Sequence, residues 1–316
     1  MRDIRAFDMF CGGGGSSLGV SLAGASVVGG IDLWKTATEA FKSNFPHSNV
    51  FNEDIRHSDP KKILKKTGPI DLLLSSPECT HHTCARGKMP RSEESKNTAF
   101  QVVRFAQAFN PRWVVLENVV HMRPWARYPE LKNALESLGY FVREQILDAS
   151  QFGVPQRRRR LFLIADKFRT PPNVALPDIG IKSAREVLDP PETWKTNPLI
   201  VPRRAVGTLE RAARAINALG KNQSFIVVYY GTDGAGGWQS LDTPLRTVTT
   251  IDRFALVEPS PSGHLIRMLQ PQEVRRAMGF PDSYFFPDAT RREKIKLLGN
   301  AVCPPVMAHV LKTLTN

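Results

Sequence analysis

The sequence has few cysteines and no long apolar run. Its four cysteines, Cys11, Cys79, Cys84 and Cys303, form no Cys-x-x-Cys pair. So few cysteines in 316 residues exclude the disulfide framework on which small secreted domains depend. No apolar segment approaches the roughly 20 residues that a membrane-spanning helix requires, and the first five residues lack the apolar core of a signal peptide. We therefore expect a cytoplasmic protein, nucleoid-associated if prokaryotic, with no membrane partner.

Acidic residues are scarce relative to basic ones. The chain has 43 Lys and Arg against 30 Asp and Glu, a formal net charge of +13. Such an excess favours a polyanionic partner, because each neutralised phosphate releases counterions. The alternative is a soluble protein with a basic surface. The length suffices for one large α/β domain and a smaller second one, and the composition is that of an ordinary globular protein.

Apolar segments alternate with helix-like segments over the first half of the chain. Strand candidates are residues 6–10, 26–31, 70–74, 113–116 and 161–165. Helical spacing occurs from residue 18 onward and at 36–45, 97–109, 272–278 and 306–314. This alternation predicts an α/β fold with a doubly wound, Rossmann-like sheet.

The character of the sequence changes near Phe168. From there to about His264 the chain is rich in proline, glycine and basic residues, with short strand signals at 225–230 and 246–250. We interpret this region as part of a second, smaller, mostly β and irregular domain. The predicted division is residues 1–167, completed by 285–316, against residues 168–284.

A glycine-rich turn follows the first strand. Gly12 to Gly15 lead into a helix, and glycine permits a positive φ and a close approach of a ligand. Asp32 stands at the end of the next strand, where a carboxylate can accept from ribose hydroxyls. Ser17 occupies the third glycine place of G-x-G-x-x-G, and no Gly-Lys-Ser/Thr follows. These departures favour an adenosyl ligand without phosphates. A turn that binds nothing is the alternative.

Cys79 follows the buried strand at 70–74, in a polar loop. Because ligands gather at the carboxyl ends of strands, this cysteine is a candidate nucleophile whose thiolate nearby cations would favour. Cys79, His81, His82 and Cys84 could instead bind zinc, although their spacing is that of no known zinc module. Packed free cysteines are the third alternative.

Two further features lie at strand ends. Burial could keep Glu117 protonated, so that it donates to a heteroaromatic nitrogen; the alternative is a glutamate that caps the next helix. Four arginines then enter the strand at 161–165. Strand alternation predicts that Arg158 and Arg160 share one face, with Arg157 and Arg159 on the other.

These features, taken in order, resemble the motifs of the DNA cytosine-5 methyltransferases. The matching segments are Asp8 to Gly15, Asp54-Ile55, Pro77-Glu78-Cys79, Glu117-Asn118-Val119, Gln156 to Arg160, Arg267 to Leu269 with Glu273, Gly279 to Asp282, and Gly299 to Pro305. Each motif is weak alone, whereas the ordered set spans nearly the whole chain and is specific.

The resemblance implies a cofactor, a partner and a set of site residues. The cofactor is S-adenosyl-L-methionine, which leaves as S-adenosyl-L-homocysteine, and no metal is implied. The partner is double-stranded DNA, bound by a monomer, with a restriction endonuclease as a candidate companion. The implied catalytic residues are Cys79, Glu117, Arg158 and Arg160. The implied cofactor contacts are Phe10, Gly12, Gly14, Gly15, Asp32, Leu33, Asp54, Ile55, Asn300 and Ala301. The implied substrate contacts are Pro77, Thr83, Asn118, Gln156, Arg246 and Thr249.

The family's chemistry assigns a role to each catalytic residue. Cys79 would attack C6 of a flipped-out cytosine, and Glu117 would hold N3 and the exocyclic amine. Arg158 and Arg160 would steady the O2 side and the active-site loop. The 168–264 region, with Arg203, Arg204, Arg246 and Arg253, would read the DNA, and the loop at 234–238 would enter a groove.

Three residues depart from the family pattern. Glu78 stands in place of the usual proline, Thr80 in place of glutamine and Asp32 in place of glutamate. An anion beside Cys79 disfavours the thiolate unless a cation compensates, and Cys84 is the fallback nucleophile. Methylation of cytosine in tRNA, and a non-catalytic module that binds the cofactor or DNA, remain as alternative functions.

Overall fold

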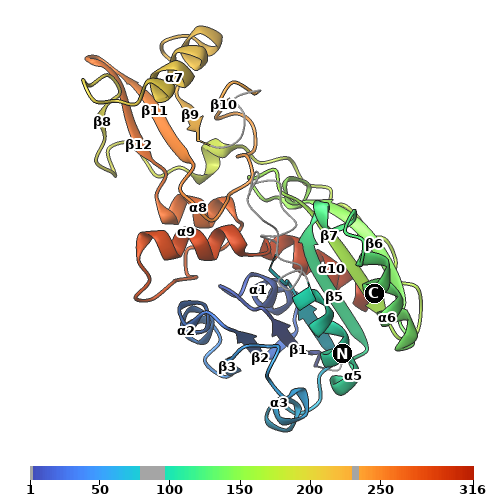
Figure 1. The fold of residues 1–316 in the computed structure, drawn as a ribbon. Helices are drawn as coiled ribbons and strands as arrows, with labels where there is room; N and C mark the ends of the chain where they lie inside the picture. Colours follow the sequence, from blue (N-terminus) through green and yellow to red (C-terminus); the bar gives the residue numbers. More distant parts are fainter. Residues whose placement is uncertain (1–2, 79–96, 230–234) are drawn as a thin grey trace.

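Two β-sheets organise the molecule (Figure 1). The computed structural model describes residues 3–78, 97–229 and 235–316. Within them, a seven-stranded sheet has the order β3-β2-β1-β4-β5-β7-β6, and a five-stranded sheet has the order β10-β9-β11-β12-β8. The strands of the first sheet are β1 (Arg5–Met9), β2 (Ser26–Asp32), β3 (Asn49–Asn52), β4 (Leu72–Ser75), β5 (Trp113–Val119), β6 (Phe141–Asp148) and β7 (Arg159–Asp166). Those of the second are β8 (Asn197–Pro198), β9 (Phe225–Val228), β10 (Trp238–Ser240), β11 (Phe254–Ser260) and β12 (Gly263–Met268).

Helices cover both faces of the first sheet and one face of the second. The α-helices are α1 (Gly15–Leu22), α2 (Lys35–Asn44), α3 (Pro60–Thr67), α5 (Gln101–Phe109), α6 (Tyr128–Ser137), α7 (Val206–Leu219), α8 (Pro271–Ala277), α9 (Arg291–Asn300) and α10 (Pro304–Thr315). Short 3-10 segments are η2 (Thr98–Phe100), η3 (Val120–Met122), η4 (Ala149–Phe152) and η5 (Ala184–Val187). In the part of the chain that the structure describes, none of the helices is long and apolar enough to cross a bilayer.

Alternating side chains of the first sheet build two apolar clusters. Leu72 and Leu74 join the cluster beneath α1, α2 and α10, whereas Leu73 joins the one beneath α3, α5 and α6. Because both faces are buried, these strands appear in the sequence as continuous apolar runs. The elements predicted in the first half of the chain are therefore confirmed. Their ends differ by three residues or fewer when η2 and α5 together are taken as the helix predicted at 97–109.

The strand order of the first sheet places a switch point between β1 and β4. Strands β1 to β5 run parallel, whereas β7 runs antiparallel to both β5 and β6. Strand β1 lies between β2 and β4, so the chain crosses from one side of β1 to the other. In open α/β sheets, ligands bind outside the carboxyl ends of the strands at such a point. The ends of β1, β2, β4 and β5 therefore define the candidate site.

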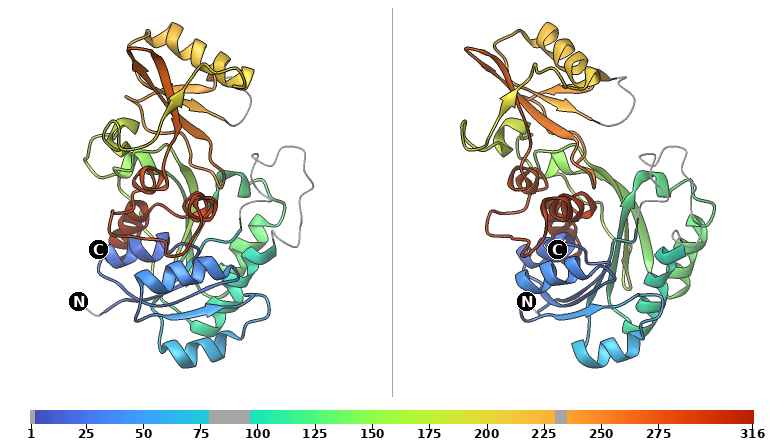
Figure 2. Two further views of the ribbon diagram at one scale, coloured as in Figure 1. Left: turned by 90° about the vertical axis from the view of Figure 1, so that its left-hand side faces the viewer. Right: turned by 60° about the vertical axis from the view of Figure 1, so that its left-hand side comes forward.

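The second sheet lies at the far end of the molecule, with α8 and α9 between it and the first sheet (Figures 1 and 2). Helix α7 covers one of its faces through Ala212 and Ala215, which pack against Phe225 and Val227 of β9. On the other face, Ile226 and Val228 join the cluster that also contains α1 and α10. The second sheet is thus anchored to the apolar interior of the first.

One expectation for this region needs correction. The strand predicted at 246–250 is wrong, because only the preceding Leu245 forms a bridge, with Gln156. The expectation of a mostly β and irregular region is confirmed by the five-stranded sheet, against which the 14-residue helix α7 packs. The strand predicted at 225–230 is β9, and Tyr230 lies outside the described residues. The division of the chain at residue 168 stays a prediction.

Candidate active site

The backbone of the glycine-rich turn that follows β1 has a left-handed conformation at three positions. Phe10, Gly12 and Gly14 have φ values of 57°, 50° and 81°. A Cβ atom on Gly14 would lie 2.2 Å from the Tyr284 hydroxyl, and one on Gly15 would lie 2.2 Å from the carbonyl oxygen of Val302. Glycine is therefore required here for the close approach of distant parts of the chain, as well as for backbone conformation.

Asp32 ends β2 directly beside this turn. Its carboxylate accepts hydrogen bonds from the backbone N–H of Gly12 at 2.9 Å and of Trp34 at 2.8 Å. Burial raises the pKa of Asp32, and these bonds partly oppose that shift. The neighbouring Leu33 side chain is exposed (66%), although it is large and apolar. A carboxylate beside an open apolar surface suits a ribose with an attached heterocycle.

Asp54 and Ile55 follow β3 along the same edge. The Arg56 guanidinium hydrogen-bonds the Asp54 carboxylate, with a shortest distance of 2.6 Å, and lowers the pKa of Asp54 to about 2. The Asp54 carboxylate is therefore ionised at neutral pH and can accept further bonds. Ile55 is buried, and its carbonyl accepts from Arg104.

A buried acid lies beneath the turn, and sequence reasoning gave it no role. Asp8 has no exposed surface; its Oδ2 accepts from the Ser17 hydroxyl at 2.7 Å, and its Oδ1 has no partner among the described residues. Burial raises the pKa of Asp8 to about 7. Burial, with Asp32 and Asp8 nearby, also holds the pKa of the Cys11 thiol well above its usual value. Cys11 is therefore an inert packed thiol.

Tyr284 is a second residue that the sequence did not single out. It is buried, and its hydroxyl donates to the carbonyl oxygen of Gly13 at 2.6 Å. Its ring contacts those of Phe45, Phe280 and Phe286. In the sequence, the only sign of this role was an aromatic residue shortly after the Gly279 to Asp282 motif. Its hydrogen-bond partner, Gly13, lies 271 positions away in the sequence.

Glu117 and Arg160 meet at the end of β5. Glu117 is buried, and its Oε1 lies 3.2 Å from Nε of Arg160 on the antiparallel β7. Burial raises the pKa of Glu117, while the cations of Arg160 and Arg158 oppose the shift. The side chain can thus hold a proton that a solvent-exposed glutamate would release at the same pH.

Asn118 connects this pair to the segment that leads to Cys79. It is buried, and its amide donates to the carbonyl oxygen of Pro77 at 3.1 Å. Pro77 is buried and Glu78 is exposed. Cys79, Thr80, His81, His82, Thr83 and Cys84 lie outside the described residues. Elsewhere, among the residues that the structure does describe, no cluster of His, Cys, Asp or Glu could hold a metal.

Arg158 and Gln156 face inward but contact the protein itself. Arg158 donates to the carbonyl oxygens of Val248 at 3.0 Å and of Gly299 and Ala301 at 2.9 Å. Gln156 donates to Ala277 at 2.9 Å and accepts from the Val248 N–H at 2.8 Å. Arg157 and Arg159 are exposed, so the predicted alternation of the arginines is confirmed.

The remaining predicted contacts come from the C-terminal half. Arg246 donates to the carbonyl oxygens of Ala235 and Trp238 at 3.0 and 2.9 Å, which holds part of the loop predicted at 234–238. Gly234 of that loop lies outside the described residues. The Thr249 hydroxyl donates to Ile251, and Asn300 is exposed at the end of α9.

A small hollow adjoins Glu117. Arg158, Arg160 and Cys303 supply its other polar groups, and the apolar lining comes from Leu147, Ala149, Phe162, Val302 and Val306. Burial raises the pKa of the Cys303 thiol to about 11. Cys303 therefore lines this hollow as an uncharged thiol and is unsuited to act as a nucleophile.

Comparisons with known proteins agree with this arrangement. The family model described as C-5 cytosine-specific DNA methylase matches residues 4–316. The type II methyltransferase M.HindV of Haemophilus influenzae is 28% identical over 327 residues, which cover 99% of this chain and 97% of that protein. Among solved structures, a triple mutant of DNMT2 from Spodoptera frugiperda has a TM-score of 0.72 at 19% identity and covers 99% of this chain and 100% of that one. The Dnmt2 methyltransferase of S. pombe has a TM-score of 0.71 at 19% identity, with 98% of both chains covered. The predicted fold class is confirmed.

Proposed function

Because this chain belongs to the C-5 cytosine-specific DNA methylase family, we propose that it methylates carbon 5 of a cytosine flipped out of double-stranded DNA, with Cys79 as the nucleophile. The observation that carries the proposal is the buried Glu117–Arg160 pair at the carboxyl edge of the sheet. The adjacent Asn118 holds the carbonyl of Pro77, two residues before Cys79.

The residues around the glycine-rich turn fit S-adenosyl-L-methionine. Asp32 can accept from ribose hydroxyls, since each of its oxygens has room for a second donor, and Leu33 offers an exposed apolar surface to the adenine. Asp54, ionised beside Arg56, can accept from the adenine amino group. Phe10, Gly12, Gly14, Gly15, Ile55, Asn300 and Ala301 would form the rest of this site. When bound, the cofactor supplies a methyl group on a sulfonium.

The chemistry that we propose begins with the Cys79 thiolate. Its sulfur forms a bond to C6, and the electrons of the C5–C6 double bond become available at C5. Glu117 in its protonated form donates to N3, which stabilises the charge that develops on the ring. Arg160 holds the Glu117 side chain in place. After C5 has gained the methyl group, a base accepts the C5 proton, and the electrons of that C–H bond re-form the C5–C6 double bond. The electrons of the sulfur–C6 bond return to sulfur, which leaves as the thiolate.

Glu78 bears on the first of these steps. A carboxylate beside Cys79 raises the pKa of the thiol and so lowers the thiolate fraction at neutral pH. Glu78 is exposed, so solvent screens much of this effect. The departure from the family's proline is thus compatible with Cys79 as the nucleophile.

The second sheet and its loops would bind the DNA. The net charge of +13 favours phosphate contacts, and a flipped base must leave its stack at a cost of a few kcal/mol. Thr83, Gln156, Arg246 and Thr249 are proposed to contact or position the DNA strand. We expect the protein to bind as a monomer. The similarity to type II methyltransferases supports a restriction endonuclease as its companion.

Transfer of labelled methyl groups tests this function. We expect label from S-adenosyl-L-methionine in duplex DNA and none in tRNA, with loss of transfer in Cys79→Ser and retention in the matched control Cys84→Ser. Label in tRNA alone would identify tRNA, and not DNA, as the substrate. Cofactor binding without transfer to either nucleic acid would indicate a non-catalytic module. Sequencing of 5-methylcytosine in DNA from expressing cells would then define the recognition site.

A further inference from the structure

Helix α7 carries two arginines that reach the segment leading into β10. Nε of Arg214 donates to the carbonyl oxygen of Gly236 at 3.0 Å. The side chain of Arg211 lies against Gly237, since a Cβ atom on that glycine would come within 2.6 Å of Nε and 2.7 Å of Cγ and Cδ of Arg211. The guanidinium carbon of Arg211 also lies 5.8 Å from the centre of the Tyr229 ring. Helix α7 therefore contacts this segment both by a hydrogen bond and by packing.

All four backbone carbonyl groups of residues 235–238 accept a hydrogen bond. Arg246 donates to the first and the last of them, at 3.0 and 2.9 Å, and Arg214 donates to the second. The third accepts from the backbone N–H of Val228, at the end of β9, at 2.8 Å. Because the donors of a guanidinium group have fixed directions, these bonds favour one backbone conformation of the segment.

The segment needs such contacts because of its two adjacent glycines. Gly236 and Gly237 have φ values of 79° and 69°. Glycine loses more conformational freedom on ordering than any other residue, so this backbone would adopt other conformations without outside contacts. A binding surface that is ordered before association loses less entropy when its partner binds. The arginines thus supply an order that the glycines by themselves lack.

Arg246 also relates the segment to the catalytic edge of the first sheet. The preceding residue, Leu245, accepts a backbone hydrogen bond from Arg157 at 2.8 Å and donates one to Pro155 at 2.9 Å. Residues 155–157 lead directly into β7, the strand that pairs with β5. Residues 235–238 are therefore connected through Arg246 to the chain that enters the candidate active site.

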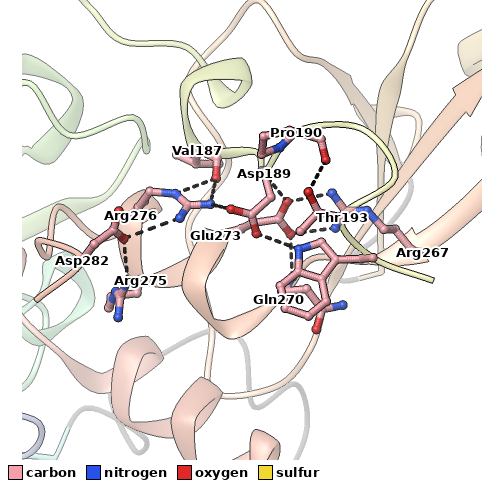
Figure 3. Close-up of polar contacts among 11 residues, drawn as sticks. Val187, Asp189, Pro190, Thr193, Arg267, Gln270, Glu273, Arg275, Arg276 and Asp282 are labelled. Atoms are coloured by element: carbon pink, nitrogen blue, oxygen red, sulfur yellow. Dashed lines mark hydrogen bonds and ion pairs between the residues drawn. The ribbon is translucent and has the colours of Figure 1, made fainter. Parts of the chain in front are cut away.

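Different contacts anchor the second sheet to α8. Arg267 of β12 donates to both carboxylate oxygens of Glu273 at 2.8 and 2.7 Å (Figure 3). In the strand order, β9 and β11 separate β12 from β10. Substitutions in α7 can therefore disturb residues 235–238 while this ion pair stays in place.

We propose that Arg211 and Arg214 of α7 are positioning residues that keep residues 235–238 in the conformation that reads base edges, and thereby set how sharply the protein distinguishes its DNA site. This inference rests on the proposed DNA methylation. Base-edge hydrogen bonds depend on exact placement of the reading segment, whereas phosphate contacts carry no direct sequence information. Loss of the α7 contacts should therefore weaken specific binding more than non-specific binding.

The test uses two substitutions in the full chain that act by different routes. Arg214→Met removes the donor to Gly236 together with a charge. Gly237→Ala leaves the charge unchanged and places a methyl group against Arg211, and the buried Gly237 is shielded from DNA itself. The matched control is Lys221→Met, which removes an exposed charge two residues beyond the end of α7.

Two measurements are made on each protein. Equilibrium binding at several salt concentrations gives the dissociation constants for a duplex with the recognition site and for one with a single changed base pair. Hydrogen exchange of the free protein reports the order of the segment through the Val228 amide, which donates to Gly237. Tm and S-adenosyl-L-homocysteine affinity are recorded in parallel.

We expect Arg214→Met and Gly237→Ala each to weaken binding to the recognition site about fivefold, the equivalent of one hydrogen bond. Binding to the changed duplex should weaken by less than about twofold, since it depends on phosphate contacts. The Val228 amide should exchange faster in both variants. Arg214→Lys, which keeps a charged donor, should recover part of the loss, and the control should keep the wild-type ratio of dissociation constants.

Three results would overturn the proposal. One is an unchanged ratio of dissociation constants in both variants. Another is equal weakening on both duplexes with a smaller salt dependence in Arg214→Met, which would show that Arg214 binds a phosphate directly. The third is a fall in Tm and in S-adenosyl-L-homocysteine affinity in step with DNA binding, which would show general destabilisation.

Neither measurement requires methyl transfer. If wild type methylates no DNA, the proposed function fails, while hydrogen exchange of the free protein still decides whether α7 orders residues 235–238. The two failures are therefore distinguishable.

Discussion

Replacing Asp8 by asparagine should make the protein less sensitive to rising pH. Asp8 is fully buried, one of its oxygens lacks a partner among the described residues, and its pKa is about 7. Asparagine has nearly the same shape, stays neutral at every pH, and keeps an oxygen that can accept from the Ser17 hydroxyl. The substitution thus removes the ionisation and little else.

The sign and size of the effect follow from linkage. The ordinary pKa of 3.8 applies to the unfolded chain, so between about pH 4 and pH 7 the folded state holds a proton that the unfolded state has released. The stability from this group is complete below pH 4 and is lost as the pH rises through 7. Between about pH 5.5 and pH 8 the loss amounts to about 2 kcal/mol of unfolding free energy.

Urea unfolding of wild type and Asp8→Asn from pH 5.5 to 8.5 measures this loss. The difference between the two unfolding free energies should fall by about 2 kcal/mol toward high pH, because other titrating groups cancel in the difference. The matched control is Asp242→Asn: arginine lowers the pKa of that exposed carboxylate, so it should add no slope in this range. Parallel pH profiles for wild type and Asp8→Asn would refute the assignment of a neutral buried carboxyl.

Three further predictions concern the catalytic pair and the glycine-rich turn. Glu117→Gln should lower kcat by about 10²–10⁴-fold with S-adenosyl-L-homocysteine affinity unchanged, and a loss below about tenfold would contradict its role. Arg160→Met should lower the unfolding free energy, measured in urea, by about 3 kcal/mol, because it leaves Glu117 buried without its nearest cation. The control Arg159→Met, on the exposed face, should change the unfolding free energy by less than about 0.5 kcal/mol. Equal effects of the two substitutions would show that the Glu117–Arg160 pair adds nothing to stability. Tyr284→Phe removes the hydroxyl that donates to Gly13, so it should lower the unfolding free energy by about 1–3 kcal/mol and weaken S-adenosyl-L-homocysteine binding. If calorimetry finds wild-type affinity for S-adenosyl-L-homocysteine, Tyr284 does not stabilise the glycine-rich turn.

The first sheet was predictable because its strands carry their own signature. The run Leu72 to Leu74 is apolar without interruption, as a strand buried on both faces must be. The run Leu161 to Ala165 looks the same, yet β7 is antiparallel to its neighbours. The direction of β7 depends on its connection from β6. The residues of β6 are mostly half-buried, so the sequence gave no clear strand pattern there.

The segment Arg246 to Thr250 shows why a local signal can mislead. Its β-branched residues favour an extended backbone, and that preference predicted a strand. In the structure, the N–H of Val248 bonds to the side chain of Gln156, and the Thr247 hydroxyl bonds to the carbonyl oxygen of Arg157. Side chains from a distant motif thus occupy the positions that a neighbouring strand would fill.

For the candidate site, sequence and structure contributed different parts. The motifs alone indicated the cofactor turn, Asp32 and Glu117 at strand ends, because strand and helix periodicity place such residues at one edge of a sheet. Alternation also predicted the shared face of Arg158 and Arg160. Tertiary structure alone decided that Arg160 meets Glu117 while Arg158 binds the carbonyls of Val248 and Ala301.

The same division applies to the glycines and to the ion pair between Asp189 and Arg276. Sequence determined where the chain must turn, since a positive φ is a local property of each residue. Only the closed fold decided that Tyr284 and Val302 would press against Gly14 and Gly15, and that Asp189 would meet Arg276, 87 positions along the chain. Periodicity depends on neighbours in the chain, whereas a contact between distant segments exists only once the two sheets have packed together.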